Sequence, residues 1–538
     1  MIKSGILKDK WAFAWFYIGF FAFILSQALG FAMSSERFGG NGLTVGVLLA
    51  AILFSLLLSL PLSGLSLQAI NSGKLRRLLR PGDAGKLSYF LIFALIVCAA
   101  LPCLLAFYPG VAAYDITYQW RTFYNDNMTS SHPLIHTILM CRTFQLGMVL
   151  FENFNLGIAL YCFLQLLLQS AVISYAIYWL QELRLPRWAF WLVFCFYALF
   201  PVFHVLGIST TKDIIFSALF TLATIFAIKA IESKSLKDTV LFSLSLMLAV
   251  LFRSNVVFSA LAVGVVILCR FAGSDNKKWM LRFLAGILAA VVAAEFTLAA
   301  LQKATDASEG STTELLSIPL QQIARVYNND YYDLDEGDLE LISRFFDTEQ
   351  LENYRESISD PVKRAFFLDA FEESPESFLG LWSDLGRRHP MRFLESFLFN
   401  TIPLWYIGDE SMLDIKNCYL EMNFKIIEDA HPNSKLPALE ALYRRFVQEG
   451  GIMQVPLLRT LAAPALYFWL IIAAAVMLIA KRKYELLLAV LFAMVYVVGL
   501  LLCPCILPRY VYAAIMSSPV IAALLIHLAN GGQAAAEN

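Results

Sequence analysis

The chain has few charged residues for its length. Asp, Glu, Lys and Arg make up only 15% of its 538 residues, and the formal net charge is −1. Because neither sign is in excess, the composition indicates neither nucleic-acid binding nor an acidic tail. Hydrophobic residues make up 59% of the chain. A high hydrophobic content with few charges is typical of a membrane protein.

The chain also lacks a disulfide framework and a visible internal repeat. Its nine cysteines are scattered, mostly through apolar segments, where cysteine is usually a small core residue. Cys503 and Cys505 lie near a boundary, but a single residue between them is a poor metal or disulfide signature. An internal repeat in the sequence would indicate a transporter built from two related halves, and no such repeat is visible.

Apolar runs repeatedly reach the roughly 20 residues that cross a bilayer, and they predict an all-α polytopic membrane protein with about twelve spans. The first run lacks a small-residue cleavage site and predicts a retained span, not a signal peptide. The predicted spans are Trp11–Met33, Leu43–Ile70, Tyr89–Phe107, Leu156–Leu180, Trp188–Val205, Thr211–Ile231, Val240–Phe252, Val256–Cys269, Phe283–Leu301, Leu461–Ala480, Leu486–Cys503 and Val511–Leu528.

Alternating the connections between these spans places most cations on one side of the membrane. By the positive-inside rule that side is cytoplasmic and holds both termini, which predicts a multi-pass protein of the cell membrane, a bacterial cytoplasmic membrane. The short outer connections carry few cations, chiefly Arg37, Arg121, Lys212, Arg253 and Arg509. The sorting bias disfavours these five, so another interaction has to retain them.

One long hydrophilic stretch, residues 302–459, lies on the outer side and has helical spacing. We therefore predict a transmembrane domain at 1–301, a mainly α-helical extracytoplasmic domain at 302–459 and a second transmembrane domain at 460–538. Within the outer loop 108–155, residues 134–151 are apolar but interrupted by charge, and we predict an interfacial or re-entrant helix there.

The same outer loop holds the candidate catalytic residues Asp115 and His132. Asp115 follows Pro109-Gly110, a pair that ends the preceding helix, and its carboxylate is suited to act as a general base or to hold a divalent cation. The structural alternative is an N-cap for a helix that starts at Ile116. Gln119, in the same loop, is a candidate substrate ligand.

His132 and His136 are four residues apart, so one helix face would present both and a metal pair is conceivable. No acidic third ligand stands at a known spacing, which favours a histidine that positions substrate by hydrogen bonds. We predict no metal site, and a divalent cofactor stays an open alternative.

Outer cations from separate spans predict a phosphate or diphosphate clamp. Lys212-Asp213 opens one span, Arg253 and Asn255 lie between two others, and Arg509-Tyr510 joins the last two. A cation at a membrane helix costs free energy unless an anion lies beside it. The planar guanidinium group of Arg matches the geometry of a phosphate. For any single cation, snorkelling to lipid headgroups is the plain alternative.

The long outer stretch adds secondary candidates that combine aromatic, carboxylate and amide groups. Such groups bind sugars, although Trp-Tyr before a turn is more often ordinary packing. These candidates are Gln321, Gln322, Arg325, Trp405, Tyr406, Asp409 and Glu410.

The layout resembles the GT-C class of membrane glycosyltransferases, in which an acidic residue sits in the first large extracytoplasmic loop after a membrane helix. Here that residue corresponds to Asp115. The pattern Tyr-Pro-Gly, Asp, Gln, His-Pro, followed by Lys212-Asp213, Arg253-Ser-Asn255 and Pro508-Arg509-Tyr510, also looks like a poorly characterised bacterial group with this layout. The Asp-x-Asp or Asp-Glu pair of several members is absent around Asp115.

The resemblance implies an inverting glycosyltransferase with a polyprenyl-phosphate or diphosphate sugar donor, an extracytoplasmic glycan, lipid or protein acceptor, and membrane lipids around it. Lys212, Arg253 and Arg509 would hold the phosphate while Asp115 meets the acceptor hydroxyl. The alternatives are a transporter or flippase for a lipid-linked saccharide, which would grip phosphate without chemistry, and a polymerase or ligase that joins lipid-linked glycans.

Overall fold

The computed structural model describes residues 2–37, 43–82, 85–113, 115–271, 277–310, 312–409 and 430–534. Throughout these ranges the regular structure is helical, and extended residues meet only in isolated bridges, without a strand. The all-α prediction is confirmed for this part of the chain.

Nine helices in the described ranges are long and apolar enough to cross a membrane, or up to eleven if each of two bent pairs forms one span. The nine are α1 (Ile2–Arg37), α2 (Val45–Asn71), α4 (Tyr89–Ala106), α6 (Leu134–Phe151), α7 (Phe154–Glu182), α10 (Lys212–Ser233), α13 (Lys277–Thr305), α25 (Tyr484–Gly499) and α26 (Pro508–Ala534). The chain therefore has the helices of a polytopic membrane protein.

Every predicted span falls on a helix. Eight coincide with one of the nine long helices, and two with the bent pairs α8 (Arg187–Leu199) and α9 (Pro201–Gly207), and α23 (Pro456–Ala462) and α24 (Pro464–Ala480). The remaining two are the shorter helices α11 (Leu236–Phe252) and α12 (Val256–Phe271). The ninth long helix is α6, for which the sequence predicts an interfacial or re-entrant position, and the count of twelve stays a prediction.

Helix α10 lies at the centre of the bundle. It packs against α7, α11, α25 and α26, and nearly all of its residues are buried. A helix that is apolar on every face is stable only when other helices or lipid surround it. Helix α26 packs on both α10 and α24, so the two helices that begin with Lys212 and with Pro508-Arg509 are neighbours in the core.

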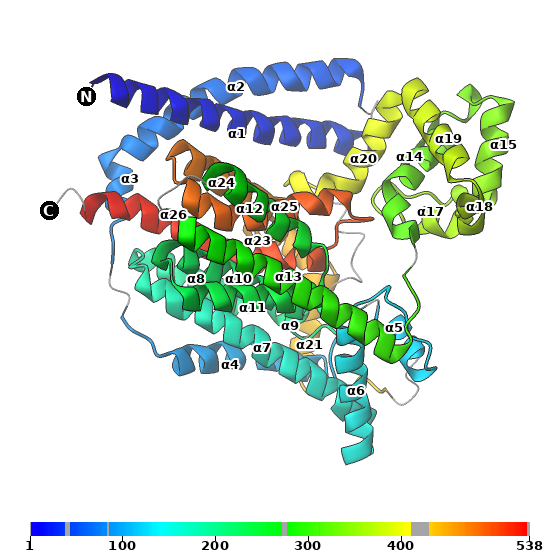
Figure 1. Cartoon of the computed structure of the whole chain (residues 1–538), viewed down its shortest axis with the longest axis horizontal. Helices are drawn as coiled ribbons and strands as arrows, with labels where there is room; N and C mark the ends of the chain where they lie inside the picture. The colour runs from blue at the N-terminus through cyan, green and yellow to red at the C-terminus, as the bar shows by residue number, and fades with distance from the viewer. Residues whose placement is uncertain are drawn as a thin grey trace.

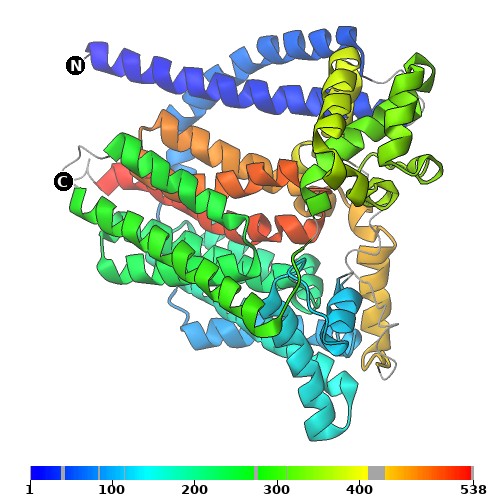
Figure 2. The ribbon, with the colours of Figure 1, turned by 45° about the vertical axis from the view of Figure 1, so that its right-hand side comes forward.

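Figures 1 and 2 show the start of α1 and the end of α26 at one end of the bundle and a small helical domain at the opposite end. Its core contains Leu320, Ile323, Phe345 and Phe378. Its helices are α14 (Ser317–Asn329), α15 (Glu336–Phe345), α16 (Thr348–Leu351), α17 (Asp360–Ala365), α18 (Leu368–Glu373), α19 (Pro375–Arg388) and the start of α20 (Pro390–Trp405). Helix α20 then runs back to α1 and α24.

Residues 430–459 pack against the bundle. They contain α21 (Pro437–Tyr443), a π-helical turn at Arg444–Gln448 and α22 (Gly451–Gln454). The Asn433 backbone N–H donates to the Tyr108 carbonyl at 2.9 Å, and the Tyr443 hydroxyl lies 2.7 Å from His204 Nδ1. The predicted division at 301 and 459 stays a prediction, and the small core occupies only the first part of the predicted outer domain.

Helices α6 and α7 form a close antiparallel hairpin that projects from the bundle in Figure 2. Asn153 caps α7 by accepting from the Leu156 N–H at 3.2 Å. A Cβ at Gly157 would lie 2.4 Å from the Phe144 carbonyl oxygen, and one at Gly147 would lie 2.3 Å from the Gly157 nitrogen. Glycine is therefore required on both sides of this contact.

Exchanging Gly157 for Leu should separate α6 from α7 and destabilise the protein by ~1–3 kcal/mol, the usual cost of overpacking. Thermal unfolding in detergent measures it. Gly380→Ala is the control, because a Cβ at Gly380 in α19 meets open space, and it should stabilise by roughly 0.5–1 kcal/mol. A Gly157→Leu protein as stable as wild type would contradict the close packing.

Candidate functional site

Two loops far apart in sequence are held together by backbone pairing. The Val111 N–H donates to the Ile208 carbonyl at 3.0 Å, and the Thr210 N–H donates to the Val111 carbonyl at 3.0 Å. The Thr210 hydroxyl donates to the same Val111 carbonyl at 3.1 Å and accepts from the Ala113 N–H at 3.1 Å. These bonds fix Asp115, two residues after Ala113, beside Lys212, two residues after Thr210.

Gly110 allows this approach. Its φ is +151°, and a Cβ there would lie 2.3 Å from the Cys162 sulfur. Only glycine fits this combination of backbone conformation and close contact without strain. The Pro109-Gly110 pair in the sequence therefore marks the turn that carries Asp115 to the site.

The Asp115 carboxylate faces three basic groups from different parts of the chain. Arg509 Nη2 lies 3.3 Å from Oδ1, while Lys212 Nζ and His132 Nδ1 lie 3.8 and 3.9 Å from Oδ2. Lys212 Nζ also donates to His132 Nδ1 at 3.1 Å. Helix α5 (Ile116–Tyr124) begins directly after Asp115, yet the Asp115 side chain makes no capping hydrogen bond. The ion pairs, not the N-cap alternative, account for its orientation.

A second carboxylate, Asp213, joins the remaining cation to the cluster. Arg253 Nη1 donates to Asp213 Oδ1 at 2.6 Å, and Arg509 Nε lies 3.8 Å from Oδ2. Both guanidinium groups lie near the Tyr510 ring, with the central carbon of Arg253 4.5 Å and that of Arg509 5.3 Å from the ring centroid. We call Asp115, His132, Lys212, Asp213, Arg253 and Arg509 the Asp115 cluster.

The Asp115 cluster has more positive than negative charge. Three cations face two carboxylates, which leaves one positive charge when His132 is neutral. Lys212 and Arg509 stand in the first turns of α10 and α26, where the helix dipoles add positive potential. Among the described residues, buried Arg509 Nε and Asn255 Oδ1 have no hydrogen-bond partner. The Arg509 Nε–H is a spare donor, whereas the Asn255 oxygen can only accept. A partly open cluster with a spare guanidinium donor and excess positive charge is suited to bind an anion.

The surroundings set the protonation of Asp115 and His132. Burial alone would raise the pKa of the Asp115 carboxyl, but Arg509, Lys212 and His132 hold it well below its usual range. Burial, with the charge of Lys212, lowers the pKa of His132 to about 4. At neutral pH Asp115 is charged and His132 is neutral, with Nδ1 accepting from Lys212.

Comparison with known families matches residues 125–537 to the family described as "Family of unknown function (DUF6020)". The chain belongs to this family. Asp115 precedes the matched region, which contains His132, Lys212, Asp213, Arg253 and Arg509. No curated protein and no solved structure matches the chain.

In this DUF6020 member, Gln119 faces away from the Asp115 cluster. Its side chain is buried, and Nε2 donates to Thr137 at 2.8 Å and to His136 Nδ1 at 3.0 Å. His136 Nε2 then donates to the Tyr161 hydroxyl at 2.8 Å, which donates to Gln165 Oε1 at 3.1 Å. The role of Gln119 as a substrate ligand stays a prediction, and its observed contacts are structural.

The hydrogen-bond chain ends on the loop before Lys212. Gln165 Nε2 donates to the carbonyls of Gly207 and Ser209 at 3.1 and 2.7 Å. The chain of Gln119, His136, Tyr161 and Gln165 therefore ties α5 and α6 to the loop that carries Lys212. Sequence reasoning missed Tyr161 and Gln165, although a glutamine in the middle of a predicted membrane span was a usable signal.

The secondary candidates of the outer stretch lie elsewhere. Arg325 is 1% exposed, binds Glu395 at 3.1 Å and lies over the Phe399 ring at 4.8 Å, so it centres a buried ion pair. Gln322 bonds the Phe393 carbonyl and the Trp382 N–H.

Trp405 and Tyr406 pack on α1 and α24, where the Trp405 carbonyl accepts from Gln27 and Trp469. Gln321 Nε2 donates to the Arg355 carbonyl, while buried Asp409 follows α20. Glu410 lies outside the described residues.

His132 and His136 do not form a metal pair, because His132 faces Lys212 and His136 faces Gln119 and Tyr161. No group of three or more His, Cys, Asp or Glu side chains in the described ranges is arranged to hold a metal ion. The alternative that Asp115 alone holds a divalent cation stays open.

The small helical domain and the segments that flank it contact both loops that deliver cluster residues. The Ser359 N–H donates to the Pro504 carbonyl at 3.1 Å, and Asn400 Nδ2 donates to the Cys503 carbonyl at 3.0 Å. On the other side, the Ser130 N–H donates to the Ser308 carbonyl at 2.9 Å. The segments leading to Arg509 and to His132 are thus braced from outside the membrane bundle.

The lowered pKa of His132 predicts a pH dependence. The unfolded chain takes up a proton at this histidine near pH 6.5 and the folded chain only near pH 4, so stability is lost as pH falls through this window. His132→Asn should make the thermal-stability profile shallower there by up to about 1.4 kcal/mol per pH unit. Equal slopes for the two proteins between pH 6.5 and 4 would contradict the buried, neutral histidine.

Tyr161→Phe should loosen the loop before Lys212, because it leaves the His136 N–H and the Gln165 oxygen unpaired at ~1–3 kcal/mol each. Amine-reagent labelling of Lys212, followed by peptide mass spectrometry, should then be faster than in wild type. The control is Tyr197→Phe, which removes an equally buried hydroxyl bonded to the Met516 carbonyl. If Lys212 is labelled at the same rate in both variants, the hydrogen-bond chain through Tyr161 does not position Lys212.

Proposed function

We propose that this DUF6020 member is a membrane glycosyltransferase of GT-C-like architecture. It would move a sugar from a polyprenyl-phosphate or diphosphate donor to an extracytoplasmic glycan, lipid or protein acceptor. The observation that carries this proposal is the contact of Asp115 with Arg509 and Lys212 in a cluster with one excess positive charge. A general base for the acceptor hydroxyl and cations for the leaving phosphate are the two groups that such a transfer needs.

In the proposed reaction the acceptor oxygen forms a bond to the anomeric carbon of the sugar as the bond from that carbon to the phosphate oxygen breaks. The acceptor proton goes to the Asp115 carboxylate, and the bonding electron pair leaves with the phosphate. Arg509 and Lys212 are placed to stabilise the charge that grows on this phosphate, where preorganised electrostatics act most strongly.

Phosphate binding would also activate Asp115. While Arg509 and Lys212 neutralise the Asp115 carboxylate, its pKa stays low and it is a weak base. A bound phosphate competes for the same two cations, which raises the pKa of Asp115 when the donor is in place. Donor binding and proton acceptance are thereby coupled through shared ion pairs.

The remaining cluster residues would act around this pair. Arg253 bonds tightly to Asp213, so its charge would act on the phosphate through the field of the cluster. Tyr510 lies beside Arg253 and Arg509, and the unpartnered Asn255 oxygen would accept from a hydroxyl of the donor. His132 would hold Lys212 in place by accepting its hydrogen bond. Substrate contacts by Gln322, Arg325, Trp405 and Tyr406 stay a prediction, and the contacts observed for them are with other parts of the protein.

The proposal includes the predicted topology. About twelve spans, with both termini in the cytoplasm of a bacterial cell, put the Asp115 cluster at the outer face of the membrane. The start of α1 and the end of α26 lie at one end of the bundle in Figure 1, which supports an even number of crossings. A lipid-linked donor would reach the cluster from the bilayer, and a water-soluble acceptor from outside.

Asp115→Asn should abolish sugar transfer, with a loss of at least about 10²-fold, because the amide cannot accept the acceptor proton. The same change should retain or strengthen polyprenyl-phosphate binding, since the competing carboxylate is gone. Arg509→Ala should instead weaken that binding. The measurements are transfer of labelled sugar to a membrane-extract acceptor and titration with polyprenyl phosphate.

The matched control is Asp126→Asn, an exposed residue of the same loop whose left-handed φ of 53° asparagine tolerates well. Full turnover by Asp115→Asn would refute the assignment. Binding of the lipid phosphate without transfer by wild type, together with movement of the lipid across vesicles, would favour the flippase alternative.

A further inference from the structure

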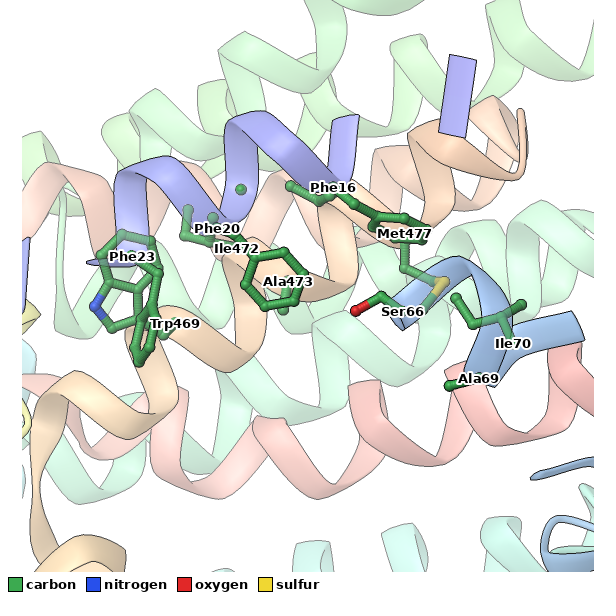
Figure 3. A pocket seen from close by; sticks show the side chains of 12 residues that line it. Phe16, Phe20, Phe23, Ser66, Ala69, Ile70, Trp469, Ile472, Ala473 and Met477 are labelled. Carbon is green, nitrogen blue, oxygen red and sulfur yellow. The ribbon is translucent and has the colours of Figure 1, made fainter. Parts of the chain in front are cut away.

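A cavity of about 410 Å³ lies between α1, α2 and α24. Figure 3 shows Phe23 and Trp469 at one end of it and Ser66, Ile70 and Met477 at the other. Ser66 and Trp469 are the only lining residues with a hydroxyl or N–H side-chain group, and the Trp469 N–H already donates to the Trp405 carbonyl at 2.7 Å. An apolar cavity of this kind does not hold water stably.

The cavity has the depth of one membrane leaflet. Its lining runs from Phe16 to Phe23 on α1 and from Trp469 to Met477 on α24, which is ~10–12 Å along a helix axis. This is close to half of the roughly 30 Å hydrocarbon core of a bilayer. A single hydrocarbon chain entering from one leaflet matches this depth.

Basic residues gather at the end of the cavity lined by Phe16, Ile70 and Met477. There the Trp11 N–H donates to the Ile479 carbonyl at 3.0 Å, and Arg482 lies 5.6 Å from the Trp11 ring, so the start of α1 meets the end of α24. The cations of these segments and of α3 (Gly73–Leu78), which follows α2, are Lys8, Lys10, Lys74, Arg76, Arg77, Lys481, Arg482 and Lys483 in the sequence, against the acidic Asp9 and Glu485.

We propose that this cavity binds one acyl chain of an anionic phospholipid, with the headgroup among these cations. Phosphatidylglycerol has the required chemistry, because its chain is apolar and its phosphate carries a net negative charge. Basic clusters at the ends of membrane helices attract such headgroups by about 1 kcal/mol per cation. The snorkelling of single cations explains their position but not the apolar cavity beside them.

The occupant is a structural lipid and not the sugar donor. No lining residue comes from α10, α26 or the two loops that build the Asp115 cluster. The hairpin of α1 and α2 is joined to the bundle mainly through α1, which packs on α24 and α20, while α2 packs chiefly on α1. A lipid chain in the cavity between α2 and α24 would supply packing contacts between these two helices. The inference is independent of the proposed function.

The test uses the full-length protein in nanodiscs of phosphatidylcholine with 20 mol% phosphatidylglycerol, taken here as roughly the anionic content that gives a membrane its surface charge. After mild delipidation, native mass spectrometry counts the retained lipids. Wild type should keep one phosphatidylglycerol. Ala473→Phe, which places a ring in the cavity, should reduce its retention at least about tenfold, the effect of ~1.4 kcal/mol.

The matched control for cavity filling is Gly64→Leu on α2, where a Cβ meets open space. It should retain lipid as wild type does. Ala69→Phe fills the cavity from the opposite wall and serves if Ala473→Phe does not fold, as judged by gel filtration. Retention by both folded filling variants at the wild-type level would overturn the proposal.

Headgroup recognition is tested by changing Lys481, Arg482 and Lys483 together to Gln. The preference for phosphatidylglycerol over phosphatidylcholine should fall, whereas the same change at Lys277, Lys278 and Arg282, at the start of α13, should leave it intact. Equal retention of the two lipids by wild type would overturn the anionic headgroup. Displacement of the retained lipid by polyprenyl phosphate would overturn the structural-lipid assignment in favour of the donor tail.

Discussion

The ion pairs of Asp115 with Arg509 and Lys212 are the interaction on which the rest of the structure depends. Removing a charged group from water costs several kcal/mol even after the protein relaxes, so charges persist near membrane helices only when opposite charges compensate them. Each carboxylate of the cluster contacts a cation, and Arg509 touches both carboxylates. The uncompensated positive charge is what distinguishes this arrangement from a purely structural salt bridge.

Several layers of the molecule serve this cluster. The backbone pairing of the loops at Val111 and Thr210 sets the spacing between Asp115 and Lys212. The hydrogen-bond chain through His136 and Tyr161 ends on the loop before Lys212 and holds it in place. The small helical domain and the segments that flank it hydrogen-bond to the segments before His132 and Arg509. Rigid support of this kind is what a site needs in order to hold charge in one geometry.

The parts of this organisation that follow from local sequence were predictable. Apolar runs of sufficient length indicated the helices, and isolated cations on the outer side indicated Lys212, Arg253 and Arg509, because such charges need a partner. Their meeting with Asp115 was an inference from that cost, and the structure brings them together. The pairing of Arg253 with Asp213 and the inward orientation of Gln119 depend on side-chain direction, which spacing along the chain does not determine. The bends at Pro201 and Pro464 and the separate packing of residues 430–459 likewise depend on tertiary contacts.

The contributions to the cluster come from opposite ends of the polypeptide, and this has a consequence for biosynthesis. Asp115, Lys212, Asp213 and Arg253 are inserted early, whereas Arg509 begins the last helix. Until that helix packs into the bundle, the two cations Lys212 and Arg253 are balanced by the two carboxylates. The net charge of the incomplete cluster is then zero, which gives no attraction for an anion. The positive excess of the cluster therefore arises only when the last helix packs against α10, so a chain that ends before residue 509 would lack it.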